Sequence, residues 1–335
     1  MISLTVIVLT YNEALHLERA IASVSGLGAK VLVVDSNSTD ATVKIAEACG
    51  ASVLQHPWEN YARQFQWALD NAPIQTEWVM RLDADEIIEP ALAAEIAARL
   101  KSLPDDVTGV NLKRKHIFMD RWVRFGGRYP LVLLRIWRRG QARIEDRWMD
   151  EHMLLVRGRA VTFEHPFADW NLNDLTFFTD KHNKYATREA VDVLNQRYGL
   201  FPTDRDILQG PGSRQARVKR LLKEGLYNRL PFWLAPTLYF LQRYILQLGF
   251  LDGRTGLIYH LLQGFWYRFL VASKVLELDR RLAAEPDREA KIRALAQLTG
   301  LALEARAAPL AQGDPEPQGP RRNRRQRANG ARSSG

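Results

Sequence analysis

The chain has 335 residues, of which 46% are hydrophobic and 25% charged, a composition typical of a globular protein with a substantial core. Its single cysteine, Cys49, excludes an internal disulfide and suits a reducing compartment. A formal net charge of +9 leaves three kinds of anionic partner open, namely nucleic acid, a membrane surface and a phosphorylated substrate. The apolar start lacks a basic segment and a small-residue cleavage site, so we expect a first strand there and no signal peptide.

Strands and helices alternate in the N-terminal part of the chain. Short apolar segments rich in β-branched residues predict strands over residues 2–9, 31–34, 51–54 and 77–82. Helical spacing of apolar residues lies between them, and the alternation predicts βαβ units with a parallel sheet. No Gly-x-Gly-x-x-Gly sequence follows the first strand, which argues against a dinucleotide-dependent dehydrogenase.

Polar residues follow three of these strands. They are Thr10, Asn12 and Glu13 after the first strand, Asp35 after the second, and Asp83 and Asp85 after the fourth. Because the carboxyl ends of parallel strands meet at one edge of a sheet, we expect these side chains to line one crevice. Asp83 and Asp85 project to the same side of an extended chain, and paired carboxylates suit Mg²⁺ or Mn²⁺. A solvated acidic turn before a helix near Pro90 is the alternative.

Three segments resemble family 2 glycosyltransferases of the GT-A fold, an α/β fold with a Rossmann-like nucleotide-binding half and a mixed acceptor half. They occur in the family's order, at residues 5–13 (TVIVLTYNE), 33–42 (VVDSNSTDAT) and 82–86 (LDADE). Among members of that family, bacterial lipopolysaccharide-core and exopolysaccharide glucosyltransferases are the most similar.

The resemblance implies a role for each of the polar residues named above. Thr10, Asn12 and Glu13 would line the nucleotide-sugar pocket, although Glu13 could instead serve only the first helical turn. Asp35 would contact the uracil, and Asp83 would approach the ribose. Asp85 would hold a divalent metal, Mn²⁺ or Mg²⁺, on the diphosphate of the donor. Asp40 is interpreted as a helix cap.

Residues 105–170 show alternating, aromatic-rich segments that predict the acceptor half of the same domain, with strands over 109–118, 121–125 and 131–137. Arginine and lysine are concentrated here, and solvated strand faces would account for many of them. The sequence Gly126-Gly127-Arg128-Tyr129 predicts a tight loop that directs a guanidinium outward. Arginine binds phosphate with a planar, bidentate fork, so a diphosphate or a phosphorylated acceptor is the expected target.

A second acidic cluster occupies residues 145–152. Inverting sugar transfer needs a base that takes the proton from the acceptor hydroxyl. In the family this base is an acidic residue after the acceptor-side strands, and we expect Asp150 in this role. Glu151 is the second candidate, with Glu145 and Asp146 behind. His152 is interpreted as either a ligand or a structural histidine, and His165 as structural.

The remaining chain predicts a helical, membrane-docking region over residues 171–300 and a disordered, Arg-rich tail over 309–335, after a GT-A domain over 1–170 with halves 1–104 and 105–170. A basic helix over 214–229 leads into two apolar segments, 230–251 and 257–278. Each approaches the ~20 residues that span a bilayer, but both are interrupted by polar residues: Gln242, Arg243, Gln247, His260, Gln263 and Arg268. We therefore expect docking on anionic lipid, ahead of ordinary helical packing and of spanning.

The sequence thus predicts a metal-dependent, inverting glycosyltransferase. Its donor would be a nucleotide sugar, UDP-linked with UDP-glucose as the candidate, and its acceptor a lipid-linked saccharide of lipopolysaccharide or exopolysaccharide biosynthesis. It would act in the cytoplasm, peripherally on the inner face of the cytoplasmic membrane, without a nucleic-acid partner. The alternative enzyme transfers sugar to polyprenyl phosphate, as dolichol-phosphate-mannose synthases do. More distant alternatives are a non-catalytic nucleic-acid-binding protein and a sugar-nucleotide-binding scaffold without turnover.

Overall fold

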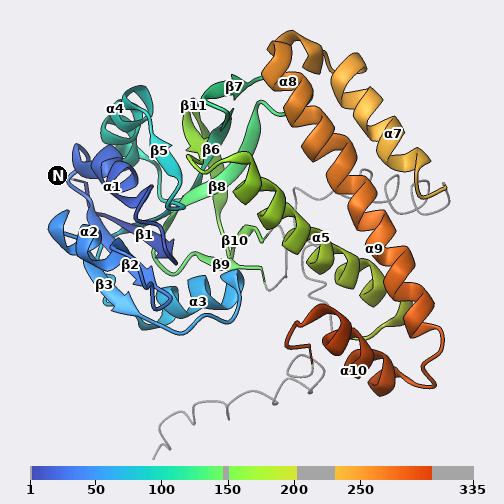
Figure 1. Ribbon diagram of the computed structural model, residues 1–335. Coiled ribbons are helices and arrows are strands. Elements are labelled where there is room, and N and C mark those ends of the chain that lie inside the picture. Colours follow the sequence, from blue (N-terminus) through green and yellow to red (C-terminus); the bar gives the residue numbers. More distant parts are fainter. Residues whose placement is uncertain (1, 146–150, 202–230, 304–335) are drawn as a thin grey trace, which may run out of the picture.

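A mixed sheet forms the N-terminal part of the protein, and long helices later in the sequence lie along one side of it (Figure 1). This computed structural model describes residues 2–145, 151–201 and 231–303. The strands of the main sheet follow the order β3-β2-β1-β4-β8-β6-β11-β5, and β7 pairs with β6. The architecture confirms the predicted α/β fold class with a helical C-terminal region.

Four parallel strands form the first half of the sheet, in agreement with the prediction from apolar segments. They are β1 (Leu4–Thr10), β2 (Lys30–Asp35), β3 (Ser52–Gln55) and β4 (Trp78–Arg81). Alternate side chains of β1 enter two different cores, which explains why the whole strand is apolar. One core contains residues of α1 (Leu17–Ser25), α2 (Thr42–Ala48) and α4 (Pro90–Arg99), and the other contains α3 (Tyr61–Asn71).

The second half of the sheet contains strands that run in both directions. Its strands are β5 (Glu86–Ile88), β6 (Val107–Phe118), β7 (Arg121–Val123), β8 (Leu131–Arg138) and β11 (Arg159–Trp170). The strand β8 pairs with β4 in antiparallel fashion, while β11 runs parallel to β6 and antiparallel to β5. A separate two-stranded sheet joins β9 (Ala142–Ile144) to β10 (Met153–Leu155). Asp83, Asp85 and Glu86, the acidic triplet, therefore lie where the chain passes from β4, in the middle of the main sheet, to β5 at its edge.

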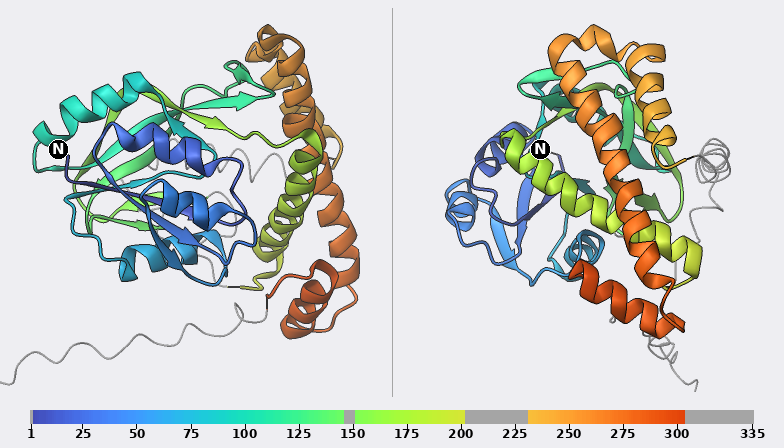
Figure 2. Two further views of the ribbon diagram at one scale, coloured as in Figure 1. Left: turned by 60° about the vertical axis from the view of Figure 1, so that its left-hand side comes forward. Right: turned by 45° about the vertical axis from the view of Figure 1, so that its right-hand side comes forward.

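The C-terminal region consists of helices that pack on one another (Figure 2). The long helix α5 (Leu175–Tyr198) begins at the predicted N-cap, where the Asp174 side chain accepts a hydrogen bond from the Phe177 amide. Helix α9 (Tyr267–Leu282) runs alongside α5, and α10 (Arg288–Thr299) closes their far end. Helix α7 (Leu234–Leu241) packs beside residues 260–266, and the Phe232 ring, just before α7, lies 5.6 Å from the Phe269 ring of α9.

Polar residues interrupt the two apolar segments where the helices change to wider π turns. The π turns are η4 (Gln242–Leu246) and η6 (His260–Trp266), and the 3-10 turn η5 (Gly249–Asp252) with α8 (Gly253–Tyr259) joins them. Apolar side chains of the first segment are exposed, at Leu238, Leu241, Ile245 and Leu248. In the part of the chain that the structure describes, no helix is both long and apolar enough to cross a bilayer. The basic helix over 214–229 and the Arg-rich tail lie outside the described residues.

Candidate active site

The carboxyl ends of β1 and β2 meet at one edge of the sheet, as the sequence predicts. Thr10 and Asp35 are register partners in the two strands, and the Thr10 hydroxyl donates to Asp35 Oδ1 at 2.8 Å. The other carboxylate oxygen, Oδ2, accepts from the Ser38 amide at 2.8 Å. Asp35 is fully buried. Its carboxylate is therefore held in one orientation by groups on both strand ends.

The loops after these strands are tied together through Asn12. Its backbone has a positive φ of 54°, in the left-handed region that asparagine tolerates better than most residues. The Asn12 amide donates to Ser38 Oγ at 2.8 Å, and its side-chain oxygen accepts from the Thr39 amide at 2.8 Å. Asn12 thus holds the loop after β1 against the loop after β2.

Glu13 and Asp40 both contact the first turns of nearby helices. The Glu13 carboxylate lies 2.7 Å from His16 Nδ1, at the start of α1, and its amide donates to Thr42 Oγ1 at 2.8 Å. The Asp40 carboxylate accepts from the amides of Thr42 and Ala14 at 2.9 Å and 3.2 Å. These contacts agree with the interpretation of Asp40 as a helix cap. For Glu13 they favour the alternative that it serves only the first turn of a helix.

Asp83 lies at the centre of a network of ion pairs. Its carboxylate accepts hydrogen bonds from the Tyr61 hydroxyl, from Arg81 Nε at 3.2 Å and from Arg135 Nη2 at 3.4 Å. Arg135 Nη2 also lies 2.5 Å from Glu86 Oε1, and the Asp83 amide donates to Glu86 Oε2 at 2.9 Å. Burial raises the pKa of Asp83, but Arg81 and Arg135 outweigh it and hold the pKa well below its usual range. Asp83 is therefore a fixed anion.

Asp85 has a different environment from Asp83. Its Oδ2 accepts from Asn171 Nδ2 at 2.9 Å, and its carbonyl accepts from the Trp170 amide at 2.9 Å. Burial and the nearby carboxylate of Asp169 raise the pKa of Asp85 above its usual value, so positive charge in addition to that already present would stabilise its ionised form. This carboxylate fits a hard divalent cation, which proteins usually bind through one or two carboxylates together with substrate phosphates and water. Among the described residues, no group of three or more acidic, histidine or cysteine side chains could hold a metal by itself.

Two basic side chains from distant segments lie near Asp85. Lys181 of α5 interacts with Asp85 and Asp169, and burial lowers its pKa, but Tyr185, Asp85 and other anionic partners outweigh this and raise the pKa overall. Arg19 of α1 also interacts with Asp85, and it donates to the Trp170 carbonyl at 2.5 Å. Both side chains bring positive charge to the edge of the sheet where a diphosphate would lie.

The sequence analysis missed Asp169, which β11 delivers to this edge. Its Oδ2 lies 3.0 Å from His116 Nδ1 and 3.5 Å from Arg114 Nη1. Burial raises the pKa of Asp169, but His116 and Arg114 outweigh it and hold the pKa well below its usual range. No local sequence pattern marks Asp169, because strand pairing is what sets it opposite His116 on β6 and Glu86 on β5.

The candidate bases are only partly within the described residues. Asp150 and Asp146 lie outside them. The Glu151 carbonyl accepts from Arg81 Nη1 at 3.3 Å, so Glu151 is connected to the Asp83 network. Glu145 is buried, with its carboxylate 3.5 Å from His152 Nδ1. His165 lies away from this edge, with its Nδ1 2.9 Å from Glu95 of α4, which fits a structural histidine.

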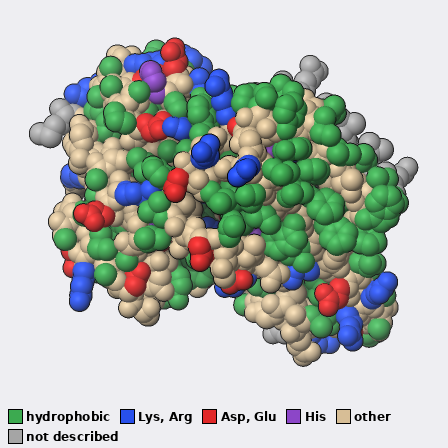
Figure 3. Space-filling model, turned by 45° about the horizontal axis from the view of Figure 1, so that its top comes forward, with side chains coloured by type: hydrophobic (Ala, Val, Ile, Leu, Met, Phe, Trp, Pro, Cys, Tyr) green, Lys and Arg blue, Asp and Glu red, His purple; other side chains and the backbone are tan. Residues whose placement is uncertain are grey.

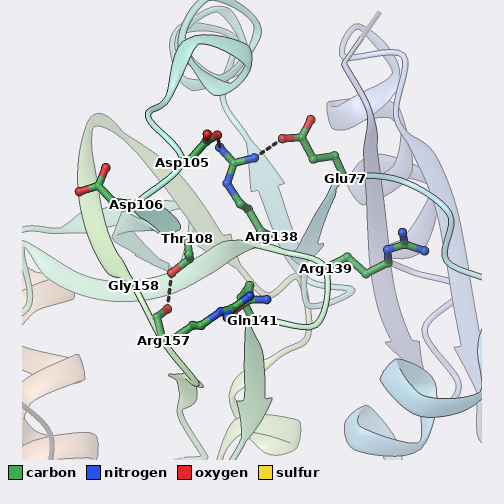
Figure 4. A pocket seen from close by; sticks show the side chains of 9 residues that line it. All are labelled: Glu77, Asp105, Asp106, Thr108, Arg138, Arg139, Gln141, Arg157 and Gly158. Carbon is green, nitrogen blue, oxygen red and sulfur yellow. Dashed lines mark hydrogen bonds and ion pairs between the residues drawn. The ribbon is translucent and has the colours of Figure 1, made fainter.

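A separate cavity of about 460 Å³ lies at the opposite edge of the sheet, near the starts of β4 and β6 (Figure 4). Arg138 pairs there with Glu77 and Asp105, and Arg157 donates to Gln141 Oε1 at 2.9 Å. The charges that line this cavity are balanced by one another. It is therefore not a second candidate for the active site.

Comparison with known proteins agrees with this geometry. Residues 5–167 match the family model of glycosyl transferase family 2, so this part of the chain is a family 2 glycosyltransferase domain and the prediction is confirmed. An uncharacterized glycosyltransferase of Rickettsia bellii is 44% identical over 89 residues, which are 27% of this chain and 30% of that protein. A Rickettsia felis protein with the same description is 43% identical over 89 residues, 27% of this chain and 31% of its own. The match thus spans less than a third of these relatives.

Among solved structures, the chain is similar to glucosyl-3-phosphoglycerate synthase from Mycobacterium tuberculosis. That protein, in complex with Mn²⁺, UDP and glucosyl-3-phosphoglycerate, is 23% identical, with a TM-score of 0.29 over 34% of this chain and 43% of the other. Another structure of the synthase contains Mg²⁺ and UDP, with 23% identity and a TM-score of 0.28, over 34% of this chain and 43% of the other. A likeness of this size is too small to place a ligand in this chain.

Asparagine substitutions should separate the environments of Asp83 and Asp85. Asp83→Asn removes the charge that two arginines bind, so it should lower the free energy of unfolding by about 1–3 kcal/mol at pH 7. Asp85→Asn removes a carboxylate whose ionised form burial and Asp169 disfavour. It should therefore leave that free energy unchanged or raise it in the absence of metal. Chemical denaturation in EDTA measures both variants.

The pH dependence provides the control for this comparison. Because the folded-state pKa of Asp83 is depressed, its stabilising effect is complete above the unfolded pKa of about 3.9 and is lost as the pH falls through the folded pKa. The stability deficit of Asp83→Asn relative to the wild type should therefore shrink below about pH 4. An equal deficit in both variants at pH 7 would contradict the assignment.

Proposed function

We propose that this protein is a metal-dependent, inverting glycosyltransferase that takes a sugar from a UDP-linked donor, with UDP-glucose as the first candidate. The observation that carries the proposal is the convergence of Thr10, Asp35, Asp83 and Asp85 at one edge of the sheet inside a family 2 domain. These residues lie at the ends of three strands, β1, β2 and β4, and the three carboxylates among them differ in charge environment. That difference matches a donor with an uncharged base, a ribose and an anionic diphosphate.

The nucleoside would lie over the ends of β1 and β2. The Asp35 carboxylate, oriented by Thr10 and Ser38, would accept a hydrogen bond from the uracil ring nitrogen. Asp83 would accept from a ribose hydroxyl, because its ionised carboxylate is fixed by Tyr61 and Arg81. Asn12 and Glu13 would shape the wall of the pocket through the loop that they hold.

The diphosphate would lie beside Asp85. A divalent cation bound there would neutralise charge on the diphosphate as it leaves. Asp85 would hold that cation, and Lys181 and Arg19 would add positive charge to the same place. The raised pKa of Asp85 and its carboxylate neighbour Asp169 are what support a cation at this position.

The acceptor would be a lipid-linked saccharide of lipopolysaccharide or exopolysaccharide biosynthesis. Asp150 or Glu151 would take the proton from the acceptor hydroxyl, whose oxygen attacks the anomeric carbon on the face opposite the diphosphate. The carbon–oxygen bond to the diphosphate then breaks through an oxocarbenium-like transition state, and the configuration inverts. The proton ends on the carboxylate, and the electron pair leaves with the nucleoside diphosphate.

The C-terminal helices would dock on the inner face of the cytoplasmic membrane. We define the apolar surface as the exposed large hydrophobic side chains of residues 232–261: Phe232, Trp233, Leu238, Leu241, Ile245, Leu246, Leu248, Phe250, Leu251, Leu257 and Leu261. Hydrophobic side chains gather over this half of the molecule (Figure 3). A continuous patch of this kind is rare on proteins without a partner, and a lipid surface would cover it.

A panel of nucleotide sugars with Mn²⁺ or Mg²⁺ tests the donor and the metal. With the correct donor we expect metal-dependent hydrolysis and a rise in melting temperature, and Asp85→Ala should reduce turnover by about 100-fold or more. Asp70→Ala, on the outer face of α3, serves as the matched control. If no donor gave metal-dependent binding and Asp85→Ala behaved like the wild type, the proposal would be wrong.

Neutral substitutions of the two candidate bases test the acceptor class. Asp150→Asn or Glu151→Gln should lower transfer to a saccharide hydroxyl by about 100-fold, because general base catalysis contributes at least that much. Binding of UDP, followed by thermal shift, should be retained. Full activity in both variants would instead favour the alternative acceptor, polyprenyl phosphate, which is already an anion and needs no base.

Charged substitutions in the apolar surface test membrane docking. Ile245→Glu with Leu246→Glu should lower binding to phosphatidylglycerol vesicles about tenfold or more, because two buried side chains are lost from the lipid interface. Leu298→Glu, an equally exposed leucine on α10, should bind like the wild type. Cosedimentation measures both, and equal binding by all three proteins would exclude this surface as the docking site.

A further inference from the structure

Two of the polar residues that interrupt the apolar segments are buried and contact the acceptor half. Arg243 of η4 is 5% exposed, and His260 of η6 is 0% exposed. Arg243 Nε donates to the Gly126 carbonyl at 2.8 Å, and the Gly126 amide donates to the Gln247 carbonyl at 2.9 Å. The loop that carries Arg128 is thus attached to the C-terminal helices.

Glycine makes the close approach of His260 possible on two sides. A Cβ atom at Gly126 would lie 2.1 Å from His260 Cε1, and Gly126 has a positive φ of 68°. A Cβ atom at Gly249 would lie 2.6 Å from His260 Nε2. The imidazole therefore occupies a space that only these two glycines leave open.

The residues around this space include two guanidinium groups that have hydrogen-bond donors to spare. The Arg128 guanidinium lies 5.3 Å from the Tyr259 ring, and that of Arg243 lies 5.4 Å from the Tyr239 ring. Among the described residues, Arg128 Nε, Arg243 Nη2 and both ring nitrogens of His260 have no hydrogen-bond partner. Nor do Arg128 and Arg243 form an ion pair there, whereas Arg268 pairs with Glu189 at 2.5 Å. Buried nitrogen atoms without hydrogen-bond partners are costly, which points to a ligand that supplies the missing acceptors.

The titration of two neighbours reports the same positive field. Burial raises the pKa of Tyr239, but Arg243, Arg268 and Arg128 outweigh it and lower the pKa overall. Burial, Arg243 and Arg128 together lower the pKa of His260 to about 4, so its imidazole is neutral at pH 7. Two guanidinium groups and one neutral imidazole N–H donor are therefore close together and have donors left for an anion.

The position of Arg128, Arg243 and His260 indicates what kind of anion would bind to them. On one side Arg128 interacts with Asp169 and His116, which belong to the edge of the sheet that holds Asp85. On the other side η4 and η5 carry Leu246, Leu248 and Phe250 of the apolar surface, which are exposed. An anion bound here would lie between the sugar-transfer site and the proposed lipid interface.

We propose that Arg128, Arg243 and His260 bind the diphosphate of an isoprenoid lipid that carries the acceptor saccharide, with the isoprenoid chain against the apolar surface. The inference rests on the proposed function and names the class of its acceptor. Arg243 can donate to a phosphate oxygen through Nη2, because its Nε and Nη1 already bond to the Gly126 carbonyl and the Tyr239 hydroxyl, and Arg128 can donate through Nε. The apolar surface beside them accommodates the hydrocarbon chain. A diphosphate alone would leave the apolar surface uncovered, and a hydrocarbon chain alone would leave the arginine donors without acceptors.

Farnesyl diphosphate, a short and soluble isoprenyl diphosphate, is the probe for this site. Titration of the full chain, followed by calorimetry, should show binding that Arg128→Gln and Arg243→Gln each weaken about tenfold or more, because each removes a charge-assisted contact. Arg293→Gln, which removes the same charge from the exposed face of α10, should bind like the wild type. Farnesol and inorganic diphosphate should both bind more weakly than farnesyl diphosphate.

Several results would overturn the proposal. They are unchanged binding in the two glutamine variants, and inorganic diphosphate that binds as tightly as farnesyl diphosphate, which would indicate a site for a free anion. If Arg243→Gln did not fold, Arg128→Gln would decide, since the Arg128 side chain makes no hydrogen bond to the described residues through Nε. UDP binding with Mn²⁺ is measured in parallel. Loss of farnesyl diphosphate binding with intact UDP binding separates failure at this site from failure of the proposed donor site.

Discussion

The arrangement of the candidate site depends on the ion pairs that Arg81 and Arg135 form with Asp83 and Glu86. Three acidic residues within four positions would repel one another, so the turn between β4 and β5 requires compensating charge. Arg135 supplies it from β8, with its side chain buried beneath the turn. The ion pairs therefore connect the parallel half of the sheet to its antiparallel half. These ion pairs fix the direction in which the chain enters β5, and therefore the position at which β5 pairs with β11.

Because the arginines bind Asp83 and Glu86, the remaining acid of the triplet is left for a ligand. Asp85 accepts from Asn171 but forms no ion pair within the part of the chain that the structure describes. Its neighbour Asp169 is engaged with His116 and Arg114, so it remains ionised next to Asp85. Two aspartates that are separated by one residue thus have different environments. Ion pairs fix the carboxylate of Asp83, and that of Asp85 is the one we propose for the cation.

The sequence was sufficient for features that are local and insufficient for those that arise from strand pairing. Apolar runs and the polar residues after them predicted β1, β2 and β4 and the meeting of Thr10 with Asp35, because parallel strands share one edge. Asp169 and Arg135 could not be singled out, since their partners come from strands remote in the sequence and no local pattern specifies that pairing. The same holds for His260, whose burial depends on two glycines far from each other in the chain.

The expected boundary at residue 170 between a sugar-transfer domain and a docking region stays a prediction, but the chemistry crosses it. Helix α5, which follows that boundary, carries Lys181 to the vicinity of Asp85. The same helix packs along α9, where Glu189 bonds to Tyr267 and Arg268. On the proposed function, this helix would link docking of the C-terminal helices to binding of the donor. A fragment that ends before α5 would lack Lys181, whose positive charge interacts with Asp85.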